Sequence, residues 1–222
     1  MSESVVIVTG ASSGIGKATA LRLARNFSCV VLAARSGEQL EQVAAQVREL
    51  GAQALVVEGD LGDPQAAETV VARTLSQFGR IDALVNVAGA VPGLDLFEMT
   101  DAQWDSGLAL KFHGARRLTL RAWEALKSSK GAVVFISGTA AEAPKAAAAA
   151  VGAINAAIEA LAKAFADRGI ADGIQVNSVS PGAVMTGRRM GMIEKLASAR
   201  HLDLDAALSL IHISEPTRQE AI

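Results

Sequence analysis

Short runs of β-branched and apolar residues alternate along this chain with longer segments in which apolar residues recur every three or four positions. The short runs predict buried strands, and the longer segments predict amphipathic helices. Strands are expected at residues 4–9, 29–34, 54–59, 82–87, 132–137 and 174–179. Helices are expected near residues 15–26, 37–50, 64–78, 101–127 and 144–168. This alternation predicts a single α/β domain with a doubly wound, mostly parallel, Rossmann-like sheet.

Two stretches bear on where elements begin and end. Thr100 and Gln103 have the spacing of a capping box, which predicts that a helix begins there. From Leu208 the string "LSLIHISEPTR" resembles the in-frame translation of a sequencing adapter. We therefore expect the native domain to span residues 1–207 and residues 208–222 to be non-native, with a native polar tail as the alternative.

Composition narrows the classes of ligand and compartment. The 222 residues carry a net charge of -2, which gives no electrostatic case for nucleic acid or an anionic membrane, so a small-molecule substrate is expected. The single cysteine, Cys29, lies in an apolar run and allows no disulfide framework, which suits a cytoplasmic protein. His113 and His201 have no ligand partners at metal-binding spacing, so no metal is expected.

A glycine-rich turn follows the first expected strand and leads directly into a helix. In "TGASSGIG" (9–16), Gly10 allows a tight turn, Gly14 lets the backbone approach a phosphate, and Gly16 permits close packing of the helix. The start of that helix offers free N–H groups and the positive end of a dipole. The pattern predicts a cradle for an anion such as a pyrophosphate.

Three motifs together resemble those of the short-chain dehydrogenase/reductase family, over about residues 4–190. Thr9, Gly10, Gly14 and Gly16 match its TGxxxGxG pattern, "NVAG" (86–89) resembles its NNAG motif, and "NSVSPGAVMT" (177–186) resembles its PG motif. Asp60 stands where the family contacts adenine. The resemblance implies cofactor contacts from Gly10, Ser12, Ser13, Gly14, Ile15, Gly16, Arg35, Ser36, Asp60, Leu61, Asn86, Ala88, Gly89, Pro181, Gly182 and Thr186.

The end of the second expected strand bears on the choice of cofactor. An acid that would bind a ribose 2′-hydroxyl is expected there, but the sequence reads "AARSG", with Arg35 and Ser36. Arginine suits a 2′-phosphate through bidentate, charge-assisted hydrogen bonds. We therefore expect NADP(H) to be preferred over NAD(H), with a solvated surface arginine as the alternative.

The family's reaction residues are all replaced. Its serine, tyrosine, lysine and helix asparagine align with Gly138, Val151, Asn155 and Lys111, and the chain contains no tyrosine. The lysine and the asparagine therefore have their places exchanged. Candidate reaction residues are Lys111, Ser137, Thr139 and Asn155.

Two functions remain open at this point. In the first, the chain is a reductase in which Lys111 acts as electrophile or acid, helped by hydrogen bonds from Asn155, Ser137 or Thr139. In the second, it binds NADP(H) as a sensor or interaction partner and performs no chemistry. A solvated Lys111, and Ser137 and Thr139 that bond only to nearby backbone, would fit the second. The resemblance also implies a homodimer or homotetramer at full length and a further strand beyond this chain.

Overall fold

The chain is divided into two compact units, Met1–Gly182 and Ala183–Ile222. The computed structural model describes residues 4–214, together with the side chains of all of these except Arg188 and residues 210–214. The first unit contains the sheet and the helices that pack on it. The second contains α7 (Gly187–Arg200) and α8 (Leu204–Ser214). The expected boundary near residue 207 falls inside α8, and residues 215–222 of the expected non-native tail lie outside the described residues.

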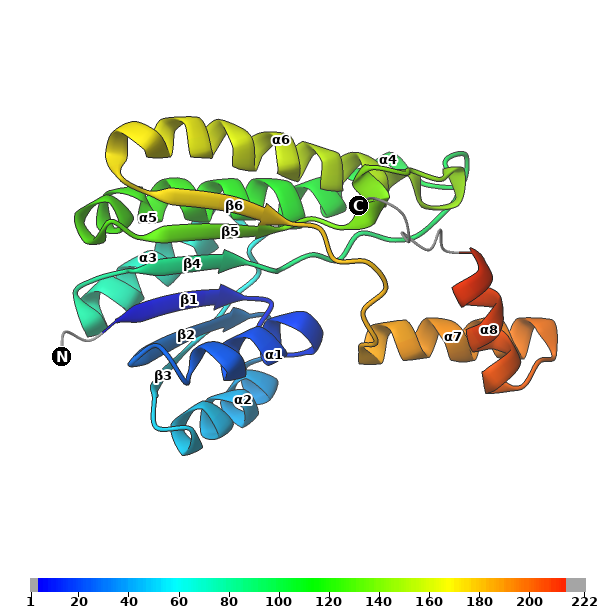
Figure 1. The fold of residues 1–222 in the computed structure, drawn as a ribbon, viewed down its shortest axis with the longest axis horizontal. Coiled ribbons are helices and arrows are strands. Elements are labelled where there is room, and N and C mark those ends of the chain that lie inside the picture. The colour runs from blue at the N-terminus through cyan, green and yellow to red at the C-terminus, as the bar shows by residue number, and fades with distance from the viewer. Residues whose placement is uncertain (1–3, 215–222) are drawn as a thin grey trace, which may run out of the picture. The chain divides into compact units, whose positions relative to one another are not determined.

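Six parallel strands form one sheet, as the sequence predicts (Figure 1). Their order is β3-β2-β1-β4-β5-β6. This order reverses direction between β1 and β4, and such a switch point opens a crevice at the carboxyl ends of the strands. The strands are β1 (Val5–Thr9), β2 (Cys29–Ala34), β3 (Gln53–Glu58), β4 (Ala83–Asn86), β5 (Ala132–Ile136) and β6 (Gln175–Val179).

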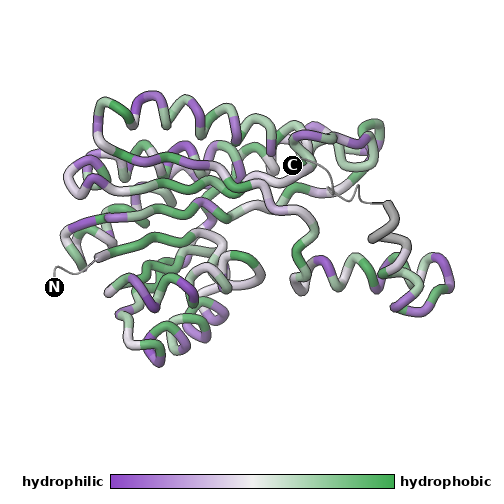
Figure 2. The backbone as a smooth tube through the Cα atoms, viewed as in Figure 1, coloured by the Kyte–Doolittle hydropathy of each residue, from purple (hydrophilic) through white to green (hydrophobic). Residues whose placement is uncertain are grey.

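Helices cover both faces of the sheet. Alternate residues of β1 point to opposite sides, so Val5 and Ile7 belong to one core cluster and Val6 and Val8 to another. The first cluster takes in residues of α3, α5 and α6, and the second takes in residues of α1 and α2. The hydrophobic run along β1 is visible in Figure 2. These helices are α1 (Gly14–Leu23), α2 (Gly37–Glu49), α3 (Pro64–Phe78), α5 (Ala115–Ser129) and α6 (Ala149–Asp172).

The helical stretch expected at 101–127 is not uniform. It begins with α4 (Asp101–Gly107) at the predicted Thr100 capping box, which is present in both of its hydrogen bonds. A π-helical segment, η1 (Leu108–Gly114), then joins α4 to α5. The expected helix at 144–168 begins later, at Ala149, after two short 3₁₀ segments, η2 (Thr139–Ala141) and η3 (Ala146–Ala148).

Ala146–Asp172 is the one helical stretch in the described residues that is long and apolar enough to cross a membrane. Its Ile154, Ile158 and Ala162 are buried in the cores beneath it. The core helix of a water-soluble fold meets the same criterion of length and composition, so this stretch is weak support for a membrane span.

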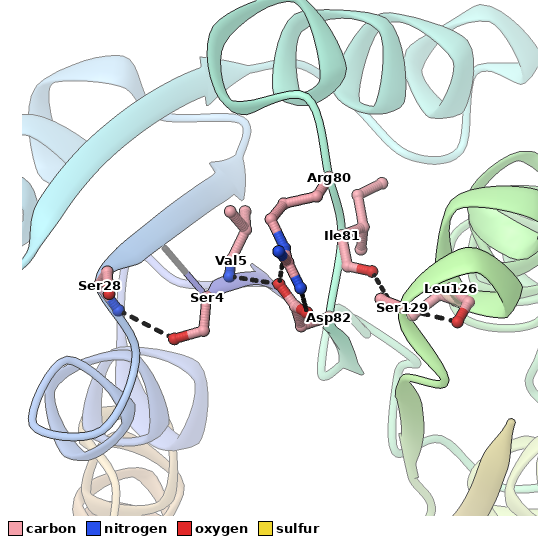
Figure 3. A network of polar contacts seen from close by, with 8 residues as sticks. All are labelled: Ser4, Val5, Ser28, Arg80, Ile81, Asp82, Leu126 and Ser129. Atoms are coloured by element: carbon pink, nitrogen blue, oxygen red, sulfur yellow. Dashed lines mark hydrogen bonds and ion pairs between the residues drawn. The ribbon is translucent and has the colours of Figure 1, made fainter. Parts of the chain in front are cut away.

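A polar network ties the amino ends of the strands together (Figure 3). The Asp82 carboxylate accepts the backbone N–H of Val5 at 2.8 Å and the Arg80 Nε–H at 2.9 Å. Ser129, at the end of α5, donates its hydroxyl to the carbonyl oxygen of Ile81, just before β4, at 2.7 Å. The network stabilises the amino ends of these strands, and the candidate site lies at the opposite, carboxyl ends.

Candidate functional site

The turn between β1 and α1 has the geometry that an anion cradle requires. Gly10 and Gly14 have φ values of 63° and 53°, in the region that favours glycine. A Cβ on Gly16 would collide with the carbonyl oxygen of Gly10, so α1 starts directly against the turn. Ser13 is the N-cap of α1, and its side chain makes no capping hydrogen bond. The first N–H groups of α1 are thus not capped by Ser13 and can face a phosphate. Two further expected cofactor residues, Ser12 in the turn and Ile15 in α1, are half-buried.

Thr9 fastens this turn to the loop that follows β4. Its hydroxyl oxygen accepts the backbone N–H groups of Val87 at 2.9 Å and Ala88 at 3.0 Å. A Cβ on Gly10 would lie 3.1 Å from the nitrogen of Ala88, so the two segments are in close contact. The first and second motifs therefore form one packed unit at the carboxyl edge of the sheet.

Two expected cofactor positions lie just beyond the ends of β2 and β3. Arg35 is exposed, and Ser36 is the N-cap of α2, with its hydroxyl accepting the N–H of Gln39 at 3.4 Å. Asp60 is also exposed, and its Oδ1 accepts the N–H of Gly62 at 2.9 Å. These side chains are placed where the two strands open toward solvent.

Two other expected cofactor residues point inward. Leu61 is 4% exposed and belongs to the core cluster beneath α3 and α5, so its side chain serves packing. Asn86 is 5% exposed, and its Nδ2 donates to the Thr119 hydroxyl at 3.1 Å. The Oδ1 of Asn86 is buried without a hydrogen-bond partner among the described residues. A cofactor contact from Leu61 would have to come from its backbone.

Lys111 is brought to the same edge by the π-helical segment. Its aliphatic stem lies along Gly89, where a Cβ would be 3.0 Å from the lysine Cδ. Its Nζ donates to the Asn155 Oδ1 and, at 3.3 Å, to the carbonyl oxygen of Ser137. The side chain is half-buried rather than solvated. The structure thus places Lys111 and Asn155 in direct contact. Lys111 lies in a π-helical segment, and π-helical turns are frequent at functional sites.

The Ser137 hydroxyl forms hydrogen bonds with two residues of α6. It donates toward the carbonyl oxygen of Asn155 at 3.1 Å and the carboxylate of Glu159 at 2.7 Å. Ser180, next to the PG motif, donates to the same carboxylate oxygen. These hydroxyl groups, Ser180 first and Ser137 second, hold the pKa of the Glu159 carboxyl below its usual range. Ser137 therefore joins β5, α6 and the loop after β6, and its direct role in chemistry stays a prediction.

Gly138, at the expected serine position, lies against an amide. A Cβ on Gly138 would lie 2.8 Å from the Asn155 Nδ2, so this space is already occupied. Thr139 is exposed at the start of η2, and its N–H donates to the carbonyl oxygen of Pro181 at 3.1 Å. Gly182 lies beside it, 4.0 Å from the Thr139 Cγ2 to a Cβ built on this glycine. Thr186 belongs to the second unit and caps α7.

Val151, at the expected tyrosine position, packs into an apolar cluster. Its side chain is half-buried against Val91, Ala150 and Ile154. Trp104 is a further partly buried member of this cluster. The valine side chain supplies no proton donor at this position, and its surroundings are apolar.

Sequence reasoning missed the carboxylate of Glu159 and its partner Ser180. The signal was available, because Glu159 follows Asn155 by four residues and so lies on the same face of α6. A carboxylate one helical turn from a candidate reaction residue is a candidate positioning group. Ser180 could not have been paired with it without the fold.

Comparison with known proteins agrees with this geometry. The family model described as short chain dehydrogenase matches residues 4–197. The chain is 33% identical over 211 residues to the short-chain reductase protein NovJ of Streptomyces niveus, covering 93% of this chain and 78% of NovJ. It is 37% identical over 142 residues to 11-beta-hydroxysteroid dehydrogenase A of Sesamum indicum, covering 63% of this chain and 41% of that protein.

A solved structure shows the same similarity. L-sorbose reductase from Gluconobacter frateurii, complexed with NADPH and L-sorbose, superposes with a TM-score of 0.92 at 29% identity, covering 99% of this chain and 85% of that one. The chain belongs to the short-chain dehydrogenase family, a family of oxidoreductases that bind nicotinamide dinucleotides. The fold and membership expected from the three motifs are confirmed.

Proposed function

We propose that this chain is an NADP(H)-dependent oxidoreductase that acts on a carbonyl or alcohol group of a small molecule through a non-standard site. The observation that carries the proposal is the position of Lys111, held by Asn155 and Ser137 beside Gly89 of the NVAG loop. A cation at this point faces the carboxyl edge of the sheet, where doubly wound folds bind ligands. The cradle at Gly10–Gly16 fits the phosphates of a dinucleotide.

The chemistry divides between the cofactor and the protein. NADPH, when bound, supplies a hydride to the carbonyl carbon. Lys111, as an ammonium, polarises the carbonyl oxygen and gives it a proton, and the Asn155 Oδ1 keeps the ammonium in place. The apolar cluster around Val151 excludes water from one side of the site. Ser137 and Glu159 act as positioning residues, since their bonds fix the backbone that holds Asn155.

A second function is favoured by the apolar packing of Val151. A valine in that cluster cannot donate a proton, and the Asn155 amide fills the space of the missing serine. A protein that binds NADP(H) as a sensor or interaction partner would need only the cradle. Loss of chemistry with full cofactor binding would identify this function.

The preference for NADP(H) rests on Arg35. It is exposed directly after β2, beside the Ser36 N-cap of α2, where a guanidinium can meet a 2′-phosphate. Arg35→Asp should weaken binding of NADPH and spare or improve binding of NADH, because a carboxylate repels the phosphate and accepts a hydroxyl. Equal loss of both cofactors in this variant would remove the assignment.

The first experiment is a fluorescence titration with NADPH and NADH, followed by turnover. Saturable binding of NADPH is expected, and NADPH oxidation is then measured with a panel of aldehydes, ketones and L-sorbose. Lys111→Ala should abolish turnover and leave the Kd for NADPH within about threefold, since the lysine acts on the substrate. Lys163→Ala, an exposed lysine on the same helix as Asn155, is the matched control. Full turnover in Lys111→Ala would eliminate the proposed mechanism.

Location and assembly are also proposed from the composition and from the outer edge of the sheet. The buried single thiol, Cys29, and the small net charge suit a cytoplasmic protein with a small-molecule substrate. The outer edge of β6 has no partner strand within residues 4–214, and its Val179 is 49% exposed. An uncovered edge of this kind favours association, so we propose a homo-oligomer, which sedimentation of the purified chain would test.

A further inference from the structure

The acidic side chain of Glu58 lies next to the proposed 2′-phosphate site at Arg35 and Ser36. Glu58 is the last residue of β3 and pairs in register with Ala34, the last residue of β2. Residues paired in this way point to the same face of a sheet, and Ala34 packs against the cluster beneath α1 and α2. The carboxylate of Glu58 therefore lies on the α2 side. A Cβ on Gly37, the first residue of α2, would be only 2.5 Å from the Glu58 Oε2.

Gly37 directly follows Arg35 and Ser36, the two residues proposed to bind the 2′-phosphate. The first turn of a helix attracts one anion through its free N–H groups and its dipole, and a second anion nearby is repelled. Glu58 is exposed, and it forms no ion pair with Arg35 within the described part of the chain. Its charge is thus not cancelled by the guanidinium that would receive the phosphate.

We propose that Glu58 is a specificity-determining residue that reduces the preference of this chain for NADPH over NADH. The inference rests on the proposed dinucleotide function. The Glu58 carboxylate opposes the 2′-phosphate of NADPH by like-charge repulsion, whereas it can accept a hydrogen bond from the 2′-hydroxyl of NADH. Arg35 and Glu58 then act in opposite directions on the same substituent, and the chain accepts both cofactors.

Glu58→Gln tests this, because it removes the charge and keeps the shape. We expect the Kd for NADPH to fall on the order of tenfold at low ionic strength, as for one charge opposing a phosphate at a solvent-exposed site. The Kd for NADH should change less than about twofold, since glutamine retains an acceptor oxygen. Both constants are measured by fluorescence titration or calorimetry, which need no turnover. The gain for NADPH should shrink in high salt, because exposed charges are screened.

Glu41→Gln is the matched control. Glu41 is an exposed acid of α2, the helix that begins at Gly37, and its carboxylate is 3.5 Å from the Arg48 guanidinium instead of lying against Gly37. This variant should leave the ratio of the two Kd values within about twofold of the wild-type ratio. An equal gain in Glu41→Gln would show a general effect of net charge and overturn the inference.

The remaining outcomes separate the two proposals. A wild-type chain that binds NADPH while Glu58→Gln leaves the ratio of Kd values unchanged overturns the role of Glu58 alone. A wild-type chain and Glu58→Gln that both fail to bind either cofactor overturn the proposed function, and the role of Glu58 with it. Far-UV circular dichroism of each variant confirms that the exposed substitution leaves the fold intact.

Discussion

Replacing Thr9 by valine should destabilise the first unit and loosen the cofactor cradle together. Thr9 is 1% exposed, and its hydroxyl accepts the N–H groups of Val87 at 2.9 Å and Ala88 at 3.0 Å. Valine has nearly the same shape but no oxygen, so two donors lose their partner. A buried unpaired group costs about 1–3 kcal/mol. Because Val87 and Ala88 are only half-buried, we expect a total loss of about 2–4 kcal/mol, in the lower part of the summed range.

Two controls distinguish the lost hydrogen bonds from the lost threonine. Thr74 is fully buried, but its hydroxyl donates to the carbonyl oxygen of Val70 at 2.7 Å, which a helix already uses as an acceptor. Thr74→Val should therefore cost less than about 1 kcal/mol, since no group is left unpaired. Thr9→Ser keeps the hydroxyl and removes one methyl group, which costs about 1 kcal/mol.

Urea unfolding followed by circular dichroism measures these differences, with a common slope for all variants. The Kd for NADPH gives a second readout, and it should rise in Thr9→Val and stay near the wild-type value in Thr74→Val. A free energy of unfolding of Thr9→Val within about 0.5 kcal/mol of the wild-type value would refute this role of Thr9, because neutral surface changes have effects of that size. An equal loss of unfolding free energy in Thr74→Val and Thr9→Val would refute it as well.

Two further predictions concern the site and the far end of α6. Gly138→Ser alone should lower the free energy of unfolding, because its Cβ would lie 2.8 Å from the Asn155 Nδ2. Adding Asn155→Lys, Lys111→Asn and Val151→Tyr should relieve this contact and raise NADPH oxidation with the carbonyl panel. No gain in stability or in NADPH oxidation would count against the alignment. Asp172 accepts hydrogen bonds from Lys127, Trp123 and Arg168, which hold the pKa of its carboxyl well below the usual range. A lowered folded pKa means that its stabilisation is complete above the unfolded value of about 3.9 and is lost as pH falls further. Asp172→Asn should therefore be less stable than wild type in urea at pH 7, and the deficit should shrink in acid; a deficit independent of pH would contradict this.

The strands and the first motif could be predicted almost completely from the sequence. A strand buried on both faces is a continuous apolar run, and "SVVIVT" and "CVVLAA" allow few other structures. The glycine turn was predictable because Gly10 and Gly14 are needed for φ values that other residues avoid. These features depend on local chemistry, so the sequence reports them directly.

The helix details could not be predicted in the same way. The π-helical segment at Leu108–Gly114 changes the hydrogen-bond spacing without breaking the apolar periodicity, so the pattern favoured one regular helix. In "AAAAA" (146–150) every position has the same helix propensity. A tertiary contact marks the boundary instead, since the carbonyl oxygen of Ala146 accepts the N–H of Leu96 at 2.9 Å, just before α6 begins at Ala149.

The expected exchange of lysine and asparagine is best considered as a pair. Considered singly, Lys111 in η1 and Asn155 in α6 would each be interpreted as the loss of one of the family's reaction residues. In the fold the Lys111 ammonium donates to the Asn155 amide oxygen, so each side chain supplies a partner for the other. A lysine at both positions would bring two ammonium groups into contact, and an asparagine at both would remove the only charge that the pair supplies. The contact makes Asn155→Lys costly unless Lys111 changes with it, and it preserves one cation and one amide at the edge of the sheet where the substrate oxygen is proposed to bind.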